Sequence, residues 1–186
     1  MNLIETTDSQ LYVYKGRIIN VRNDKITLPD GKPAEREVVE HNGGVAIVAL
    51  TDDGDILLVE QFRYPYMKTV LEIPAGKLDK GEDPLSAAKR ELSEETGANA
   101  KKWESLGEYY PTPGYTNEII HLFYASKLNF GKQNPDEDEF LMLKKMPLSQ
   151  AVNMIIKNEI PDGKTQTAVL KMYCSCQVSG VNFQNL

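Results

Sequence analysis

One acidic segment constrains this chain more than any other, residues 76–98, which read GKLDKGEDPLSAAKRELSEETGA. The segment predicts a short helix after a glycine-rich turn. Asp83 is a favoured N-cap residue, and Pro84 suits the first helical position because its missing N–H would be unbonded there anyway. Gly97 can adopt the left-handed conformation that ends a helix. Apolar residues recur between these ends at helical spacing, so one face should lie in a core.

Three carboxylates lie close together on the predicted helix. Glu91 and Glu95 are one turn apart, and Glu94 lies beside them. Such groups repel one another and destabilise a helix unless a positive partner lies between them. A hard divalent cation with oxygen ligands is the simplest partner of this kind. The alternative is a solvated acidic face, which is the more frequent meaning of such residues on an arbitrary helix.

The spacing of the fixed residues separates these alternatives. The segment fills every position of the pattern G-x5-E-x7-R-E-U-x-E-E-x-G-U, where U is apolar, with Gly76, Glu82, Arg90, Glu91, Leu92, Glu94, Glu95, Gly97 and Ala98. A chance match has a probability on the order of 10⁻⁸ per window. The pattern resembles the Nudix box. The chain therefore resembles the Nudix hydrolases, a family that cleaves nucleoside diphosphates linked to another moiety with Mg²⁺ or Mn²⁺.

Composition excludes several other classes of protein. With 186 residues, 41% hydrophobic and 26% charged, the chain fits an ordinary globular protein. The net charge of −6 argues against a nucleic-acid surface, although a bound metal would still allow a phosphate ligand. No apolar run reaches the length of a membrane span, and the first ten residues lack the pattern of a signal peptide. We expect no membrane partner and a cytoplasmic location.

Residues 1–43 predict a separate small β unit. Short strand-like runs alternate with turn signals such as Lys15-Gly16 and Pro29-Asp30-Gly31, which favours a meander of three or four antiparallel strands. A sheet of this size needs an apolar surface to pack on, either in the same chain or in another copy.

Residues 44–186 predict an α/β domain. Residues 45–50 form a continuous apolar run, typical of a strand buried on both faces, and we expect a hairpin with residues 56–62. Further strands and two C-terminal helices favour a mixed sheet with helices on both sides. The resemblance implies a Nudix α/β/α sandwich preceded by the small N-terminal antiparallel unit.

The resemblance also assigns roles within the box. It implies that the backbone carbonyl of Ala75 and the side chains of Glu91 and Glu95 hold the metal ions. Glu94 is the next-best ligand and a second catalytic candidate. We interpret Arg90 as structural, paired with Glu82 or Glu94, in preference to a substrate contact.

A general base is expected from the acidic stretch 136–139. By itself such a run usually means a solvated loop. It resembles, however, the acidic loop of the Nudix subgroup that acts on ADP-ribose. The resemblance implies Glu137 as the general base and Glu139 as an auxiliary metal ligand, with the two exchangeable because the sequence does not fix which carboxylate reaches the water.

A proline-rich stretch, YPTPGYTNE at residues 110–118, indicates the substrate class. Its simplest interpretation is a rigid turn, but the same subgroup has a proline in the corresponding place. The resemblance implies substrate contacts from Arg36, Glu37, Arg63, Lys77, Thr112, Pro113, Gly114 and Glu118. Where better-known relatives stack an aromatic side chain on adenine, this chain has Arg17, whose guanidinium can also stack.

Together these features predict a Mg²⁺-dependent ADP-ribose pyrophosphatase, with Mn²⁺ as a possible substitute, that yields AMP and ribose 5-phosphate. The resemblance further implies a homodimer with exchanged N-terminal units. Two alternatives stay open. One is hydrolysis of another nucleotide, such as GDP-mannose or a diadenosine polyphosphate. The other is a non-catalytic module that senses ADP-ribose, against which the complete set of box carboxylates argues.

Overall fold

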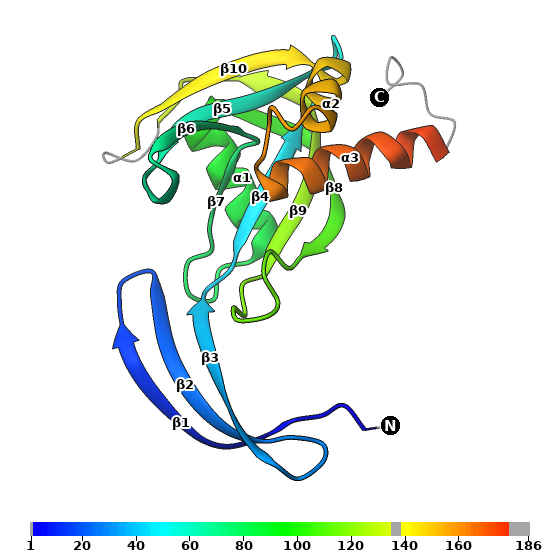
Figure 1. Ribbon diagram of the computed structural model, residues 1–186. Coiled ribbons are helices and arrows are strands. Elements are labelled where there is room, and N and C mark those ends of the chain that lie inside the picture. Colours follow the sequence, from blue (N-terminus) through cyan, green and yellow to red (C-terminus); the bar gives the residue numbers. More distant parts are fainter. Residues whose placement is uncertain (1, 135–138, 179–186) are drawn as a thin grey trace. The chain divides into compact units, whose positions relative to one another are not determined.

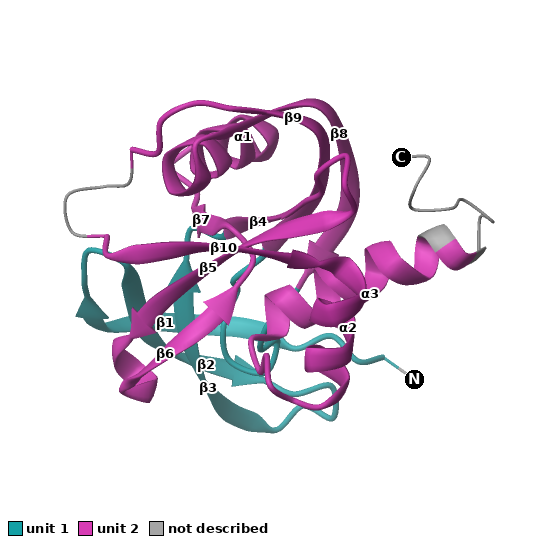
Figure 2. Cartoon of the chain, turned by 90° about the horizontal axis from the view of Figure 1, so that it is seen from above, with its two compact units in different colours: residues 1–43, 110–119 teal, residues 44–109, 120–186 magenta. Residues whose placement is uncertain are grey.

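The structure is a computed structural model that describes residues 2–134 and 139–178. Its elements in chain order are β1 (Thr6–Lys15), β2 (Ile19–Thr27), β3 (Pro33–His41), β4 (Gly44–Ala49), β5 (Asp55–Arg63), the 3₁₀ turn η1 (Tyr64–Tyr66), β6 (Lys68–Glu72), β7 (Ala75–Lys77), α1 (Pro84–Thr96), β8 (Ala98–Tyr109), β9 (Ile120–Phe130), β10 (Leu141–Pro147), α2 (Leu148–Ile156) and α3 (Gly163–Val178) (Figure 1). They divide into two compact units, Met1–Gly43 with Tyr110–Ile119, and Gly44–Tyr109 with Ile120–Leu186 (Figure 2).

The first unit is built on an antiparallel sheet in the order β1-β2-β3, as the sequence predicts. The proline-rich segment 110–119 belongs to this unit although it lies far along the chain. It is held by β3, because the N–H of Val39 donates to the carbonyl of Tyr115 at 2.7 Å and the N–H of Asn117 donates to the carbonyl of Val39 at 3.2 Å. Local sequence gives no sign of this pairing.

The second unit contains two sheets, with the orders β7-β4-β9-β8 and β10-β5-β6. The first is mixed, because β4 pairs antiparallel with β7 and parallel with β9. Strand β4 is buried along its whole length. Its odd residues Val45, Ile47 and Ala49 pack in a cluster with α1, and its even residues Ala46 and Val48 pack with residues of α2 and α3. Helices therefore cover both sides of this strand (Figure 1), which confirms the predicted sandwich.

The predicted hairpin of residues 45–50 and 56–62 is wrong. Strands β4 and β5 belong to different sheets and share only an isolated bridge between Leu50 and Ile56. The turn between them is tight, with the N–H of Thr51 bonded to the carbonyl of Asp55 at 2.8 Å. Each strand finds its ladder partners elsewhere in the chain, so sequence adjacency does not decide the pairing.

Helix α1 has the ends that its sequence predicts. The Asp83 side chain accepts from the N–H of Ser86 at 2.9 Å, Pro84 begins the helix, and Gly97 has a φ of 70°. Among the described residues, no helix is long and apolar enough to cross a membrane. The cytoplasmic location stays a prediction.

Candidate active site

A glycine is needed where the chain enters the acidic segment. A Cβ on Gly76 would lie 1.9 Å from both Cδ and Oε1 of Glu91. The Glu91 carboxylate therefore lies directly against the backbone of the turn. Its side chain is largely buried, and burial raises its pKa, while the neighbouring Arg90 opposes that shift.

Glu95 is the most deeply buried carboxylate of the helix, with 1% of its surface exposed. Its Oε2 accepts from the backbone N–H of Ala75 at 3.0 Å. Burial raises the pKa of Glu95 to about 8; the charges of Glu91 and Glu139 act in the same direction, and the hydrogen bond from Ala75 opposes them. The C-terminal half of α1 and the first two residues of β7, Ala75 and Gly76, thus enclose two carboxylates, and burial disfavours their ionised forms.

Arg90 ties the acidic groups together on the outer side of α1. Its guanidinium donates to Glu82 at 3.1 Å, to Glu91 at 2.8 Å and to Glu94 at 3.0 Å, and more weakly to the carbonyl of Lys77 at 3.3 Å. Both carboxylates suggested as its partners, Glu82 and Glu94, are bonded to it. The bond to Glu82 is the main reason why the pKa of Arg90 is raised.

Glu82 also closes the loop before α1. Its carboxylate accepts from the N–H of Asp79 at 3.0 Å, and its own N–H donates to the carbonyl of Asp79 at 3.0 Å. Lys77, next to the turn, has an exposed side chain. The first half of the acidic segment thus shapes the loop, and its second half supplies the buried carboxylates.

Arg63 is held by a buried carboxylate that the sequence analysis did not single out. Its Nε and Nη2 each donate to Glu72 at 2.6 Å. Lys164 contacts the same carboxylate and donates to Asp162 at 2.9 Å. Burial opposes the charged form of Glu72, yet Arg63 and Lys164 hold the pKa of that carboxyl below its usual range. The possible signal was a glutamate within the apolar run VLEI of residues 70–73.

The predicted base, Glu137, lies outside the described residues. The segment before it is anchored to the C-terminal end of α1, where the Gln133 amide donates to the carbonyl of Glu95 and the Asn134 N–H donates to the carbonyl of Glu94 at 3.0 Å. Glu139, the first described residue after this stretch, is half-buried, and its charge raises the pKa of both Glu91 and Glu95. Gln133 carried no sequence signal.

The described side chains do not by themselves form a complete metal site. Within residues 2–134 and 139–178, no group of three or more His, Cys, Asp or Glu side chains is arranged to hold a metal ion. Of the carboxylates in the acidic segment 76–98, Glu91 and Glu95 are the two that are buried.

The other predicted contacts belong to the first unit. Arg36 and Glu37 are consecutive in β3, so their side chains leave opposite faces of the strand. The Arg36 guanidinium is paired with Glu5, at 3.0 Å from Nε. The turn around Pro113 is closed by the N–H of Thr116, which donates to the carbonyl of Thr112 at 3.2 Å. Gly114 lies in open space, where an added Cβ would meet no atom within 4 Å.

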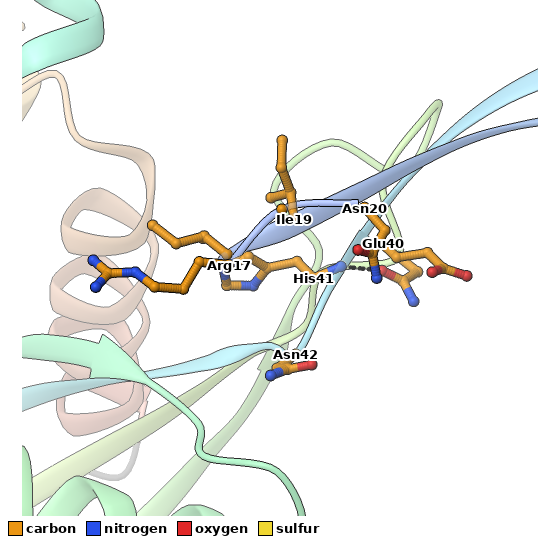
Figure 3. Close-up of a pocket in the computed structure, with 9 residues that line it drawn as sticks. Arg17, Ile19, Asn20, Glu40, His41 and Asn42 are labelled. Atoms are coloured by element: carbon orange, nitrogen blue, oxygen red, sulfur yellow. Dashed lines mark hydrogen bonds between the residues drawn. The ribbon is translucent and has the colours of Figure 1, made fainter. Parts of the chain in front are cut away.

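Glu118 lies near a polar pocket of the first unit. Its Oε1 is 3.3 Å from Nδ1 of His41. The pocket has a volume of about 370 Å³ and is lined by residues that include Arg17, Asn20, Glu40, His41, Asn42 and Asn117 (Figure 3). Nδ1 of His41 accepts from the N–H of Gly43 at 3.0 Å, and the His41 N–H donates to the Asn117 side chain at 2.9 Å.

Comparison with known families decides the identity of the larger part of the chain. The family model described as "NUDIX domain" matches residues 40–167. The chain belongs to the Nudix family. A second model, "Nucleoside diphosphate sugar hydrolase N-terminal domain", matches residues 5–39. The acidic segment 76–98 lies within the matched NUDIX domain.

Individual relatives cover most of this Nudix chain. It is 42% identical over 170 residues to an ADP-ribose pyrophosphatase of Bacillus subtilis, a match that covers 90% of this chain and 92% of the relative. It is 43% identical over 168 residues to a methanol dehydrogenase activator of Bacillus methanolicus, with 89% and 90% covered. A crystal structure named "ADP compounds hydrolase" has the same fold, with a TM-score of 0.85, 21% identity, and 98% and 100% covered.

Proposed function

We propose that this Nudix protein hydrolyses ADP-ribose to AMP and ribose 5-phosphate with Mg²⁺, or Mn²⁺ as a substitute. The observation that carries the proposal is the buried pair Glu91 and Glu95, packed on the Ala75–Gly76 turn. The 42% identity to an ADP-ribose pyrophosphatase over most of both chains supports the substrate.

The residues of the turn suit a hard divalent cation. Burial raises the pKa of both glutamates, and the charge of Glu139 acts in the same direction on each, so a nearby cation would stabilise their ionised forms. We assign Glu91, Glu95 and the Ala75 carbonyl as ligands and Glu139 as an auxiliary one, all of them oxygen donors. When bound, such a cation lowers the pKa of a coordinated water and neutralises charge on phosphate oxygens.

Glu137 is our candidate for the base that takes the proton from the attacking water. The bonds of Gln133 and Asn134 to the end of α1 support this role, because they tie the chain just before Glu137 to the helix that carries the metal glutamates. Glu94 and Glu139 remain alternatives. One carboxylate oxygen of Glu94 is already bonded to Arg90.

Arg63 is our candidate for the diphosphate. Its Nε–Nη2 edge is fixed on Glu72, so Nη1 is directed away from that partner. Lys77 follows Ala75 and Gly76 in β7, and its exposed side chain offers a second cation. For the nucleoside and sugar we assign Arg36, Glu37, Glu118 and the turn of residues 112–114, with Arg17 as a guanidinium that can stack on adenine.

The first unit gives a reason to expect a homodimer with exchanged N-terminal units. All ten residues of β1 are exposed, and they include Leu11, Val13 and Tyr14. An exposed apolar edge strand favours pairing with another chain. Light scattering of the purified protein should give twice the mass of one chain.

One assay separates the candidate substrates. ADP-ribose, GDP-mannose, a diadenosine polyphosphate and NADH are each incubated with and without Mg²⁺, and the products are identified by chromatography. We expect AMP and ribose 5-phosphate from ADP-ribose with Mg²⁺ at the highest kcat/KM. Faster cleavage of GDP-mannose would make GDP-mannose the assigned substrate in place of ADP-ribose. Binding of ADP-ribose without any cleavage would favour the sensing module.

A further inference from the structure

Three different elements fix the backbone of three consecutive residues, Ile73 to Ala75, the last of which is the proposed carbonyl ligand. The N–H of Ile73 donates to Oγ1 of Thr165 in α3 at 2.9 Å. The carbonyl of Pro74 accepts from Ile47 in β4 at 2.8 Å. The N–H of Ala75 donates to Glu95 in α1 at 3.0 Å. Of these three elements, α1 carries the proposed metal glutamates, whereas α3 carries none of the proposed metal ligands.

The hydroxyl of Thr165 is held in one orientation by its hydrogen bonds. The residue is fully buried, and its hydroxyl accepts from Ile73 while it donates to Asp162 at 2.6 Å. Asp162 also accepts from the N–H of Thr165 at 3.0 Å. The hydroxyl therefore has one defined donor and one defined acceptor, which fixes its orientation. The same bonds close the first turn of α3.

We propose that Thr165 is a positioning residue for the cation site, which holds the Ile73–Ala75 backbone so that the Ala75 carbonyl faces Glu91 and Glu95. This inference rests on the proposed function. Thr165 touches neither of these glutamates in the contacts above, and it acts through the backbone two residues before the proposed ligand. Groups that orient metal ligands typically change metal affinity by 10- to 100-fold when they are lost.

The test compares two substitutions at Thr165 with one matched control. Thr165→Val keeps the shape and removes the hydroxyl, and Thr165→Ser keeps the hydroxyl. Thr51→Val removes another buried threonine hydroxyl, which accepts from the N–H of Asp55 at 3.2 Å in the turn between β4 and β5. Each variant is titrated with Mn²⁺ without substrate, followed by electron paramagnetic resonance, and its melting temperature is recorded.

Thr165→Val should weaken Mn²⁺ binding by about 10-fold or more, and Thr165→Ser should bind as the wild type does. Thr51→Val should lower the melting temperature but leave Mn²⁺ affinity unchanged. Equal Mn²⁺ affinity in Thr165→Val and wild type would overturn the proposal, as would an equal loss in Thr51→Val. Because no substrate is used, a wild type that fails to cleave ADP-ribose contradicts the proposed function but not this inference.

A second measurement avoids the need for a folded variant. In the wild type, Mg²⁺ should slow hydrogen exchange of the Ile73 amide at least as much as that of Ala75, because both are fixed in the same bound arrangement. Slowing at Ala75 without any change at Ile73 would overturn the proposal.

Discussion

Glu91 lies against the α-carbon of Gly76, so closely that a methyl group there would overlap its carboxylate. The contact joins α1 to strand β7, through two residues that are fifteen positions apart in the sequence. It explains why a glycine stands at the first position of the Nudix box.

Gly76→Ala should expel the Glu91 carboxylate from its place. A Cβ 1.9 Å from Cδ cannot be accommodated, so either the side chain or the turn must move. We expect Mn²⁺ affinity to fall by about 10-fold or more, and kcat to fall with it. Gly131→Ala is the control, since its Cβ would meet only one atom, at an ordinary contact of 3.6 Å. Unchanged Mn²⁺ affinity in Gly76→Ala would contradict the assignment of Glu91.

Glu95→Gln tests the second carboxylate. The amide can still accept from Ala75 but carries no charge, so kcat for ADP-ribose should fall by about 10²-fold or more while the fold is kept. Circular dichroism checks that the fold is kept, and steady-state rates with Mg²⁺ give kcat. Glu159→Gln, a change of the same kind at an exposed residue, should leave both unaltered. Wild-type turnover in Glu95→Gln would remove this residue from the mechanism.

Stability of the metal-free protein should depend on pH through Glu95. Its pKa is about 8 in the fold, against about 4.3 in an unfolded chain. The folded state therefore binds more protons between these values, and the free energy of unfolding falls as pH rises from about 4.5 to 8, at most by about 1.4 kcal/mol per pH unit. Glu72 has a lowered pKa, so the stability that it contributes is lost only as pH falls below this range.

Melting temperatures with EDTA, from pH 5 to 8.5, measure this dependence. Glu95→Gln should make the curve less steep, with a smaller slope left from Glu91, whose pKa burial also raises. Mg²⁺ added at pH 8 should stabilise the wild type more than Glu95→Gln. A Glu95→Gln curve that is parallel to the wild type would show that another group is responsible.

Local signals predicted the helix of the box and its ends. Asp83, Pro84 and Gly97 act on backbone groups within one turn of themselves, so no distant contact is needed to read them. The burial of β4 on both faces was equally legible, because six consecutive apolar or small residues leave no polar face.

Contacts between distant segments could not be predicted in the same way. The hairpin failed because β4 pairs with β7 and β9, whereas β5 pairs with the next strand, β6, and with β10. Thr165 reaches Ile73 across 92 positions, and a single sequence carries no mark of such a bond. Arg63 was recognised as a cation, but its fixed edge on Glu72 depends on where β5 and β6 pair.

Glu137→Gln tests the proposed base directly. Loss of the carboxylate should lower kcat by about 10²-fold or more with little change in Mn²⁺ affinity, because a base that does not bind metal acts only on the water proton. Rates and Mn²⁺ titration are measured together, with Glu104→Gln, an exposed residue of β8, as the control. A loss of Mn²⁺ affinity equal to the loss of kcat would make Glu137 a ligand, and would pass the role of base to Glu139 or Glu94.

Arg63→Lys should separate charge from geometry at the diphosphate. A lysine keeps one positive charge, but it cannot hold Glu72 with two bonds and still direct a third nitrogen outward. We expect KM for ADP-ribose to rise by about 10- to 100-fold, the value of one charge-assisted hydrogen bond, with a smaller change in kcat. Lys68→Arg alters the residue paired with Arg63 across the β5–β6 ladder, where the side chain is exposed, and should behave as wild type. An unchanged KM in Arg63→Lys would mean that Arg63 serves only to neutralise Glu72, and the phosphate contact would then have to come from Lys77.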